Sequence, residues 1–146
     1  MFLQFVQQST PKLELERLLA QAARFFSAEL QVLAEDKASL WATLRWKTAL
    51  DPETTFALHA RLTTAADRAR LPSAELANQS YGMAGLGERC ACVWEVVPAP
   101  DASPAACFQF GALLASVALG PWLPADGCGL FGVRSARLFA ERLRAG

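Results

Sequence analysis

Two stretches of strictly alternating apolar and polar residues, separated by a proline turn, constrain the fold of this chain more than any other feature. Residues 40–47 alternate in this way, and residues 55–62 do so again. A period of two places successive side chains on opposite faces of a β-strand, so we expect an antiparallel hairpin that turns at residues 51–53. The alternative, a helix over 52–70, is disfavoured because it would scatter the apolar groups around the helix axis.

Segments with helical spacing flank this hairpin. Thr10 and Pro11 are typical of a helix start, and apolar residues then recur at helical spacing from residue 15 to residue 30. Residues 30–34 are either the last turn of this helix or a short strand. Two further helices are predicted near the C-terminus, over 104–119, between Ser103-Pro104 and Gly120-Pro121, and over about 133–145. The segment between them, 121–132, is predicted to be a Gly/Pro-rich loop that holds Trp122 and Cys128.

The segment between the hairpin and helix 104–119 is less strongly patterned. A short helix is predicted from Pro72 to Asn78 or Tyr81, and a strand over 90–97 that ends at Pro98. Gly82, Gly85 and Gly87 are interpreted as a flexible turn or bulge. They do not form a phosphate loop, because they precede a strand, whereas such a loop follows a strand and opens a helix.

These elements define an α+β class. We expect one domain over residues 1–146, with an antiparallel sheet of three or more strands and helices packed mainly on one face. The order of the strands cannot be derived from the sequence.

The chain contains more apolar residues than an average globular domain. It is 53% hydrophobic and 19% charged, against roughly 45–50% and about 25% in typical chains. Helix 104–119 is apolar on all sides, which indicates burial on several sides, either within the subunit or between two subunits. Either the core is unusually complete or some apolar surface meets a partner. We expect the second, with another protein or a second copy in a homodimer as the partner.

The charge balance disfavours several partners. Fourteen basic and fourteen acidic residues give no net charge, whereas nucleic-acid binding usually requires a basic excess. The longest apolar stretch, 105–119, is shorter than the ~20 residues of a membrane span. Residues 1–10 lack the features of a signal peptide. We therefore expect a cytoplasmic protein without nucleic acid or membrane span, and the abundance of Arg and Ala indicates a GC-rich bacterial genome.

No motif for catalysis, a metal or a cofactor stands out. Cys90 and Cys92 are two apart on a predicted strand and so share its core face with Trp94, and buried thiols behave as small hydrophobes. Cys107 and Cys128 have no Cys or His neighbour, as a metal site would require. Cys128, between two glycines, is expected to be the most accessible thiol.

His59 is the only histidine. A catalytic histidine needs a nucleophile and an orienting acid, and the sequence identifies neither. The simpler interpretation is a half-exposed residue on the polar face of its strand. A Cys–His pair is possible only if Cys128 folds back onto the hairpin.

Six residues are predicted to contact a ligand or partner. Trp41 is an aromatic on the polar face of the hairpin, and Trp and Arg are enriched at binding hot spots. The alternative for the tryptophans is core packing, and for the arginines of the last helix a solvated face. The set is Trp41, Arg45, His59, Trp122, Arg134 and Arg137.

These features predict a non-enzymatic protein-interaction domain, acting as an adaptor, chaperone-like or regulatory subunit. The alternative is a small-molecule-binding domain or small enzyme with an apolar pocket between helix and sheet. The expected lining of that pocket is Trp94, Phe108, His59, Tyr81 and Arg45.

Overall fold

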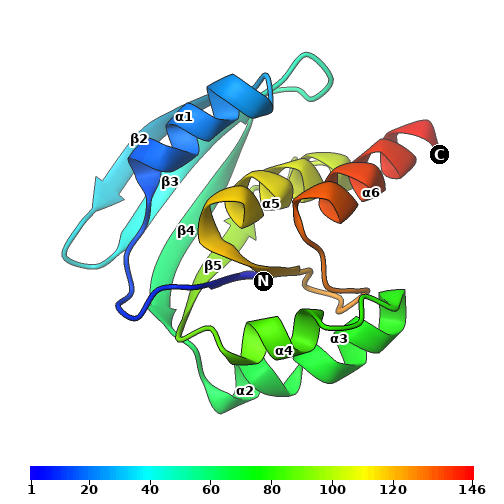
Figure 1. The fold of residues 1–146 in the computed structure, drawn as a ribbon. Coiled ribbons are helices and arrows are strands. Elements are labelled where there is room, and N and C mark those ends of the chain that lie inside the picture. Colours follow the sequence, from blue (N-terminus) through cyan, green and yellow to red (C-terminus); the bar gives the residue numbers. More distant parts are fainter.

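The computed structural model describes residues 1–146 as a six-stranded antiparallel sheet with helices on both sides (Figure 1). The strand order is β2-β3-β4-β5-β1-β6, so the predicted hairpin, now β3 and β4, extends into a three-stranded meander with β2. The α+β class and the antiparallel sheet are confirmed. The strands are β1 (Phe2–Val6), β2 (Glu29–Asp36), β3 (Trp41–Lys47), β4 (Thr54–Leu62), β5 (Cys92–Pro98) and β6 (Leu119–Leu123).

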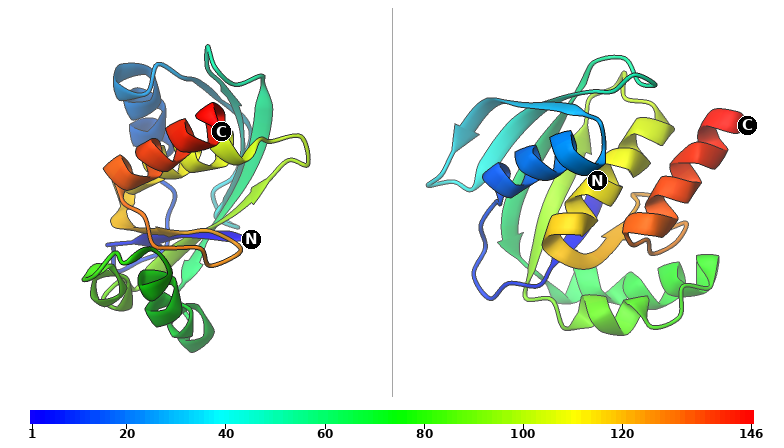
Figure 2. Two further views of the ribbon diagram at one scale, coloured as in Figure 1. Left: turned by 90° about the vertical axis from the view of Figure 1, so that its right-hand side faces the viewer. Right: turned by 45° about the horizontal axis from the view of Figure 1, so that its top comes forward.

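Three helices cover the inner face of the sheet. Figure 2 (left) shows them on one side of the β2–β5 strands. They are α1 (Leu15–Phe25), α5 (Pro104–Ala118) and α6 (Val133–Ala145). Phe110 of α5 stacks on Phe56 at 4.0 Å between ring centroids and meets the edge of Trp46 at 5.5 Å. These aromatic contacts fill the main core between α5 and the sheet.

A second, smaller core lies at the β1–β6 end of the sheet. It involves the short helices α3 (Leu71–Asn78) and α4 (Met83–Glu88), which follow the short helix α2 (Ala65–Ala69) in the chain. Leu3 and Phe5 of β1 pack in this core with Leu71 of α3, whereas Phe2 and Val6 pack against the main core on the opposite face. Strand β1 is therefore buried on both faces.

Helix α5 explains much of the apolar excess. Twelve of its 15 residues are buried, all within the same subunit, since the sheet lies on one side and α1 and α6 on the other. The N-terminus agrees with the prediction, because Ser103 Oγ accepts the amide of Ala106 at 3.0 Å and Pro104 follows it. The apolar side chains of α5 are therefore covered without a second subunit.

Several elements differ from the sequence prediction. Helix α1 starts at Leu15, not at Thr10, and ends at Phe25, so that residues 30–34 belong to strand β2. The glycine segment forms helix α4 in place of a flexible turn. Strands β1 and β6 were not predicted, and β6 occupies the start of an expected loop over 121–132. No helix has the length and apolar character needed to cross a membrane.

Candidate functional site

The outer face of β2, β3 and β4, and of β5 from Glu95 onward, carries no helix (Figure 2, left), whereas Val93 at the start of β5 packs in the second core with Leu71 of α3. On it the side chains form rows that cross the strands, and one row consists of Asp36, Trp41, His59 and Glu95 in direct register. Trp41 is 39% exposed, and Val97, on the same face, is 50% exposed. Three of the six predicted contact residues, Trp41, Arg45 and His59, therefore share this surface, which we call the outer sheet face.

A network of ion pairs crosses the outer sheet face. Glu95 accepts from Arg61 Nε at 2.9 Å and lies 3.1 Å from His59 Nδ1. Arg61 also donates to both carboxylate oxygens of Asp67, at 2.6 and 2.9 Å. Asp67 in turn accepts the backbone amide of Thr64 at 2.8 Å, which completes the N-terminal cap of α2. The network thus fixes the side chains of β4 and β5 to the first turn of α2.

The network lowers the pKa of both carboxylates. Burial by itself would raise the pKa of Asp67, but the hydrogen bonds from Arg61 and Thr64 outweigh it and lower the pKa. The pKa of Glu95 is lowered for the same reason, with burial opposed by Arg61 and His59. The same contacts raise the pKa of Arg61. All three groups are therefore charged at neutral pH.

Arg45 lies on the same face, separated from Trp41 and His59 by the uncharged residues Thr43 and Ala57. Its guanidinium donates to Gln31 on β2 and lies 3.3 Å from Glu53 in an ion pair that water reaches. An exposed pair of this kind contributes little to stability, so Arg45 can exchange these partners for others at small cost.

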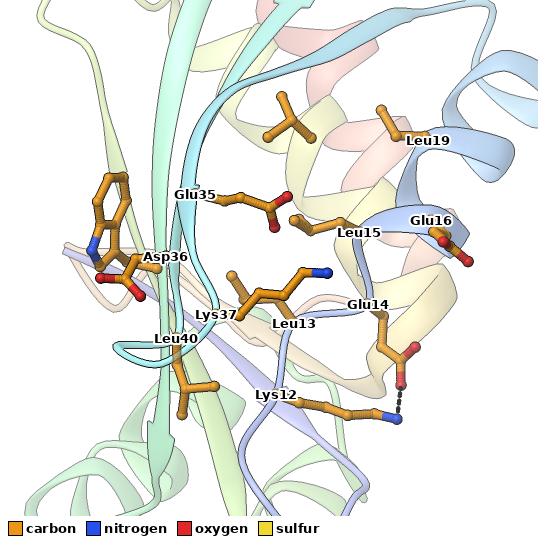
Figure 3. Close-up of a pocket in the computed structure, with 12 residues that line it drawn as sticks. Lys12, Leu13, Glu14, Leu15, Glu16, Leu19, Glu35, Asp36, Lys37 and Leu40 are labelled. Atoms are coloured by element: carbon orange, nitrogen blue, oxygen red, sulfur yellow. Dashed lines mark ion pairs between the residues drawn. The ribbon is translucent and has the colours of Figure 1, made fainter.

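An open cavity of about 470 Å³ lies on the other side of β2, between α1 and the β2–β3 hairpin. In Figure 3 Leu15, Glu35 and Lys37 point into this space. Glu35 faces it because a bulge between Val32 and Ala34 shifts the register, which places Glu35 opposite the inward-facing Ala42. The floor is apolar and includes Leu13, Leu15, Leu19, Val32 and Leu40.

The rim of this cavity is charged and more acidic than basic. It carries Lys12, Lys37, Glu14, Glu16, Glu35 and Asp36. Two carboxylates are engaged, since Glu14 pairs with Lys12 at 3.3 Å, and Asp36 accepts the amides of the turn at Ala38 and Ser39. Glu16 and Glu35 are exposed and make no ion pair.

The prediction that Trp122 contacts a partner is wrong. Trp122 is 1% exposed and stacks on Phe2 at 5.1 Å, with Gly111 of α5 against the indole ring. Its segment is strand β6, hydrogen-bonded on one side to β1 and on the other to Phe131. The flanking prolines had suggested an exposed loop, but pairing with β1 brings the segment into the sheet.

The arginines of α6 do not form a common site. The guanidinium of Arg137 lies over the ring of Phe26 at 4.1 Å and donates to the carbonyl of Phe25, so this side chain joins α6 to the end of α1. Arg144 pairs with the buried Asp51 at 2.7 Å. Arg134 is exposed, at the N-terminus of α6 and away from both. Arg137, which was predicted to contact a ligand or partner, therefore has a structural role between α6 and α1.

The expected pocket residues are dispersed. Trp94 and Phe108 are buried in the core, where Trp94 Nε1 donates to the carbonyl of Lys12 at 2.9 Å. Tyr81 is 69% exposed and lies in the short connection between α3 and α4. The space between α5 and the sheet is filled with aromatic rings, and the cavity lies instead beside α1.

The cysteines do not come together. Cys92 and Cys107 lie in the main core as small apolar side chains, and Cys90 lies in the second core, just before β5, so it does not share a face with Cys92. Burial raises the pKa of Cys90, Cys107 and Cys128 to about 11. Cys128 is the least buried of the four thiols. No group of three or more His, Cys, Asp or Glu side chains that could hold a metal ion is present.

Glu95 and Asp67 were not identified from the sequence. Glu95 is the single charged residue of the otherwise apolar segment 92–98, a signal that one point of this strand faces water. Thr64 and Asp67 have capping-box spacing, which is a local signal for a helix start. The contact of both Glu95 and Asp67 with Arg61 depends on the tertiary structure.

Comparisons with family models, with curated protein sequences and with solved structures give no match to this chain.

Proposed function

We propose that this chain is a non-enzymatic protein-interaction domain that binds its partner over the outer sheet face. The observation that carries the proposal is the exposure of Trp41 and Val97 on a sheet face that no helix covers. Large aromatic and arginine side chains supply most of the energy at protein interfaces, and Arg45 lies four residues from Trp41 on the same face of β3. An adaptor, chaperone-like or regulatory role is compatible with such a face.

The ordered ion pairs of this face also support the proposal. His59, Glu95 and Arg61 are joined by contacts of 2.9 to 3.1 Å, and Arg61 is further held by Asp67. Side chains that are already ordered lose less conformational entropy when a partner binds. Backbone hydrogen bonds between the paired strands also restrict the movement of the main chain. This face therefore offers a rigid surface to a partner.

Site-specific photo-crosslinking tests the proposal. A benzophenone amino acid replaces Ala57, at the centre of the outer sheet face, and in a matched control replaces Ala77, an exposed alanine on α3. We expect irradiation of cells that produce the protein to give a defined crosslinked product from position 57, identified by mass spectrometry, and none from position 77. Equal labelling at both positions, or no product at position 57, would refute the proposal.

The cavity beside α1 favours a second candidate function, the binding of a small amphiphilic molecule. Its volume of about 470 Å³ falls within the roughly 300–1,000 Å³ of ligand sites, and apolar side chains form its floor. Four carboxylates and two lysines line it, so the rim favours a cationic head group over an anionic one.

Two alkyl probes of the same length distinguish this candidate. Dodecylamine carries a positive charge and dodecanoate a negative one, and each is titrated below its micelle concentration while tryptophan emission is recorded. Trp41 borders the cavity, whereas the other tryptophans are buried. We expect dodecylamine to bind more tightly, and Glu35→Gln to reduce that preference. Equal binding of both probes, or of neither, would remove this candidate.

A further inference from the structure

The outer sheet face has an uncharged centre with polar rows on either side. The central row consists of Ala34, Thr43, Ala57 and Val97, which are direct neighbours across the four strands, with the exposed Leu33 at the bulge beside them. One flanking row is Gln31, Arg45 and Thr55, and the other is Asp36, Trp41, His59 and Glu95. The first flanking row carries a positive charge, and the second carries two carboxylates and the aromatic ring.

We propose that a second copy of this chain binds to this face, with the two-fold axis along the central row; the inference rests on the proposed function and names its partner. A two-fold axis in the plane of the sheet, along that row, turns the second sheet over and exchanges the flanking rows, while each strand stays over its own counterpart. Arg45 of each copy then faces Trp41 of the other. In a two-fold interface this contact occurs twice.

The chemistry of the facing rows is complementary under this operation. A guanidinium over an indole ring is a favourable cation–π contact. The side chain of Arg45 is 42% exposed, and its partners are the exposed Gln31 and the weakly paired Glu53. The row that faces Arg45 also contributes Asp36 and Glu95 of the second copy. A positive row therefore meets a row with two carboxylates in both halves of the interface.

Residues on a two-fold axis face their own copies, so a charged residue there would meet a like charge. The central row has none, and its small side chains permit the two sheets to approach closely. The chain as a whole carries no net charge, so long-range repulsion does not oppose self-association.

Pairing of two copies through the β2 edge is less favourable. The edge strand contains a bulge, and it carries Glu29, Glu35 and Asp36. In an antiparallel pair of β2 strands these carboxylates of the two copies would lie close together, and bulges and charges are features that prevent edge pairing. The structure therefore favours association through the face rather than through the edge.

The area of the outer sheet face sets the expected affinity of the dimer. Four strands spaced by about 4.8 Å, over about 27 Å along the strands, give roughly 500 Å² per copy, or about 1,000 Å² in total. Specific interfaces bury about 1,200–2,000 Å², so this one lies at the weak end of the range. We expect a dimer that dissociates at micromolar concentrations.

Sedimentation of the full chain over about 1–500 µM measures this equilibrium. Ala57→Arg places two like charges at the axis, and we expect at least a tenfold increase in the dissociation constant. Arg45→Ala is expected to raise it by about three- to tenfold, since it removes the contact with Trp41. Ala77→Arg on α3 adds the same charge elsewhere and should leave the equilibrium unchanged. Circular dichroism checks that each variant is folded.

The outcomes separate this inference from the proposed function. A wild-type chain that stays monomeric up to the highest concentration overturns the second copy as partner, and so does a dimer that Ala57→Arg leaves intact. If a monomeric chain still gives a crosslink to a different protein at position 57, the outer sheet face remains an interaction surface and only the identity of the partner changes. If no crosslink of any kind forms there, the proposed function fails as well.

Discussion

Arg61 on β4 holds Asp67 of α2 by two parallel hydrogen bonds, of 2.6 and 2.9 Å, and uses its third donor group on Glu95 of β5. The bidentate geometry matches the fork of a guanidinium to a carboxylate. One side chain therefore connects the centre of the sheet with the helical segment that follows β4.

This network predicts an acid-sensitive stability. The folded-state pKa values of Asp67 and Glu95 are lowered, so their stabilising contribution is present above the unfolded-state values of about 4 and is lost as the pH falls through the folded-state values. We expect Asp67→Asn to reduce the free energy of unfolding at pH 7 by about 1–2 kcal/mol and to flatten its dependence on pH below about 5. Urea unfolding between pH 3 and pH 7 measures both effects.

The control for this prediction is Glu88→Gln, because Glu88 is exposed and makes no ion pair. It should leave the profile unchanged. A wild-type profile that is flat between pH 3 and pH 7 would contradict the prediction.

Gly111 permits α5 to lie against the indole ring of Trp122. A methyl group added at Gly111 would overlap that ring, which is enclosed and cannot move aside. We expect Gly111→Ala to destabilise the fold by about 1–3 kcal/mol, despite the better helix propensity of alanine. Thermal or chemical unfolding measures the loss.

Gly85→Ala is the matched control. Gly85 lies within α4, and a methyl group there meets no neighbouring atom. The substitution should be neutral or stabilise by up to about 1 kcal/mol. Equal effects of the two substitutions would show that the packing of Gly111 on Trp122 is not important.

Gln4 is a buried polar side chain in β1 that supports an irregular strand pair. Its Nε2 donates to the carbonyl of Gly120 at 2.7 Å and to that of Phe5 at 2.9 Å, where the register between β1 and β6 shifts. Gln4→Leu leaves the Gly120 carbonyl without this partner, and we expect a loss of about 1–3 kcal/mol.

The neighbouring exposed Gln7 provides the control, since Gln7→Leu changes the same atoms on the surface. Hydrogen exchange of the amides in β6 should increase in Gln4→Leu and not in Gln7→Leu. Unchanged exchange in both variants would contradict a role of Gln4 in holding β6.

The thiols are expected to react slowly while the chain is folded. With a pKa of about 11, Cys128 contains about a hundredfold less thiolate at pH 8 than an unperturbed thiol. Labelling with Ellman's reagent should reach Cys128 first and the three buried thiols only after unfolding in urea. Rapid labelling of the folded chain, or of Cys92 before Cys128, would contradict the assignment.

The sequence by itself determined the strands with strict apolar–polar alternation and the helix with a clear N-terminal capping signal. The hairpin of β3 and β4, with Trp46 inside and Trp41 outside, follows from its period of two. Helix α5 was predicted with its correct start, because Ser103 and Pro104 are local signals. The exposed placement of Arg45 and His59 on one face followed from the same alternation.

The tertiary structure decided what local pattern does not encode. Strands β1 and β6 are short, and each is defined by hydrogen bonds to partners far away in the sequence, so that the prolines around Trp122 gave a false indication of a loop. The joining of Arg61 with Asp67 and Glu95, and the turning of Glu35 into the cavity by a bulge, likewise depend on how strands pair. Side-chain periodicity reports which face a residue occupies, whereas strand order and register set which residues meet across that face.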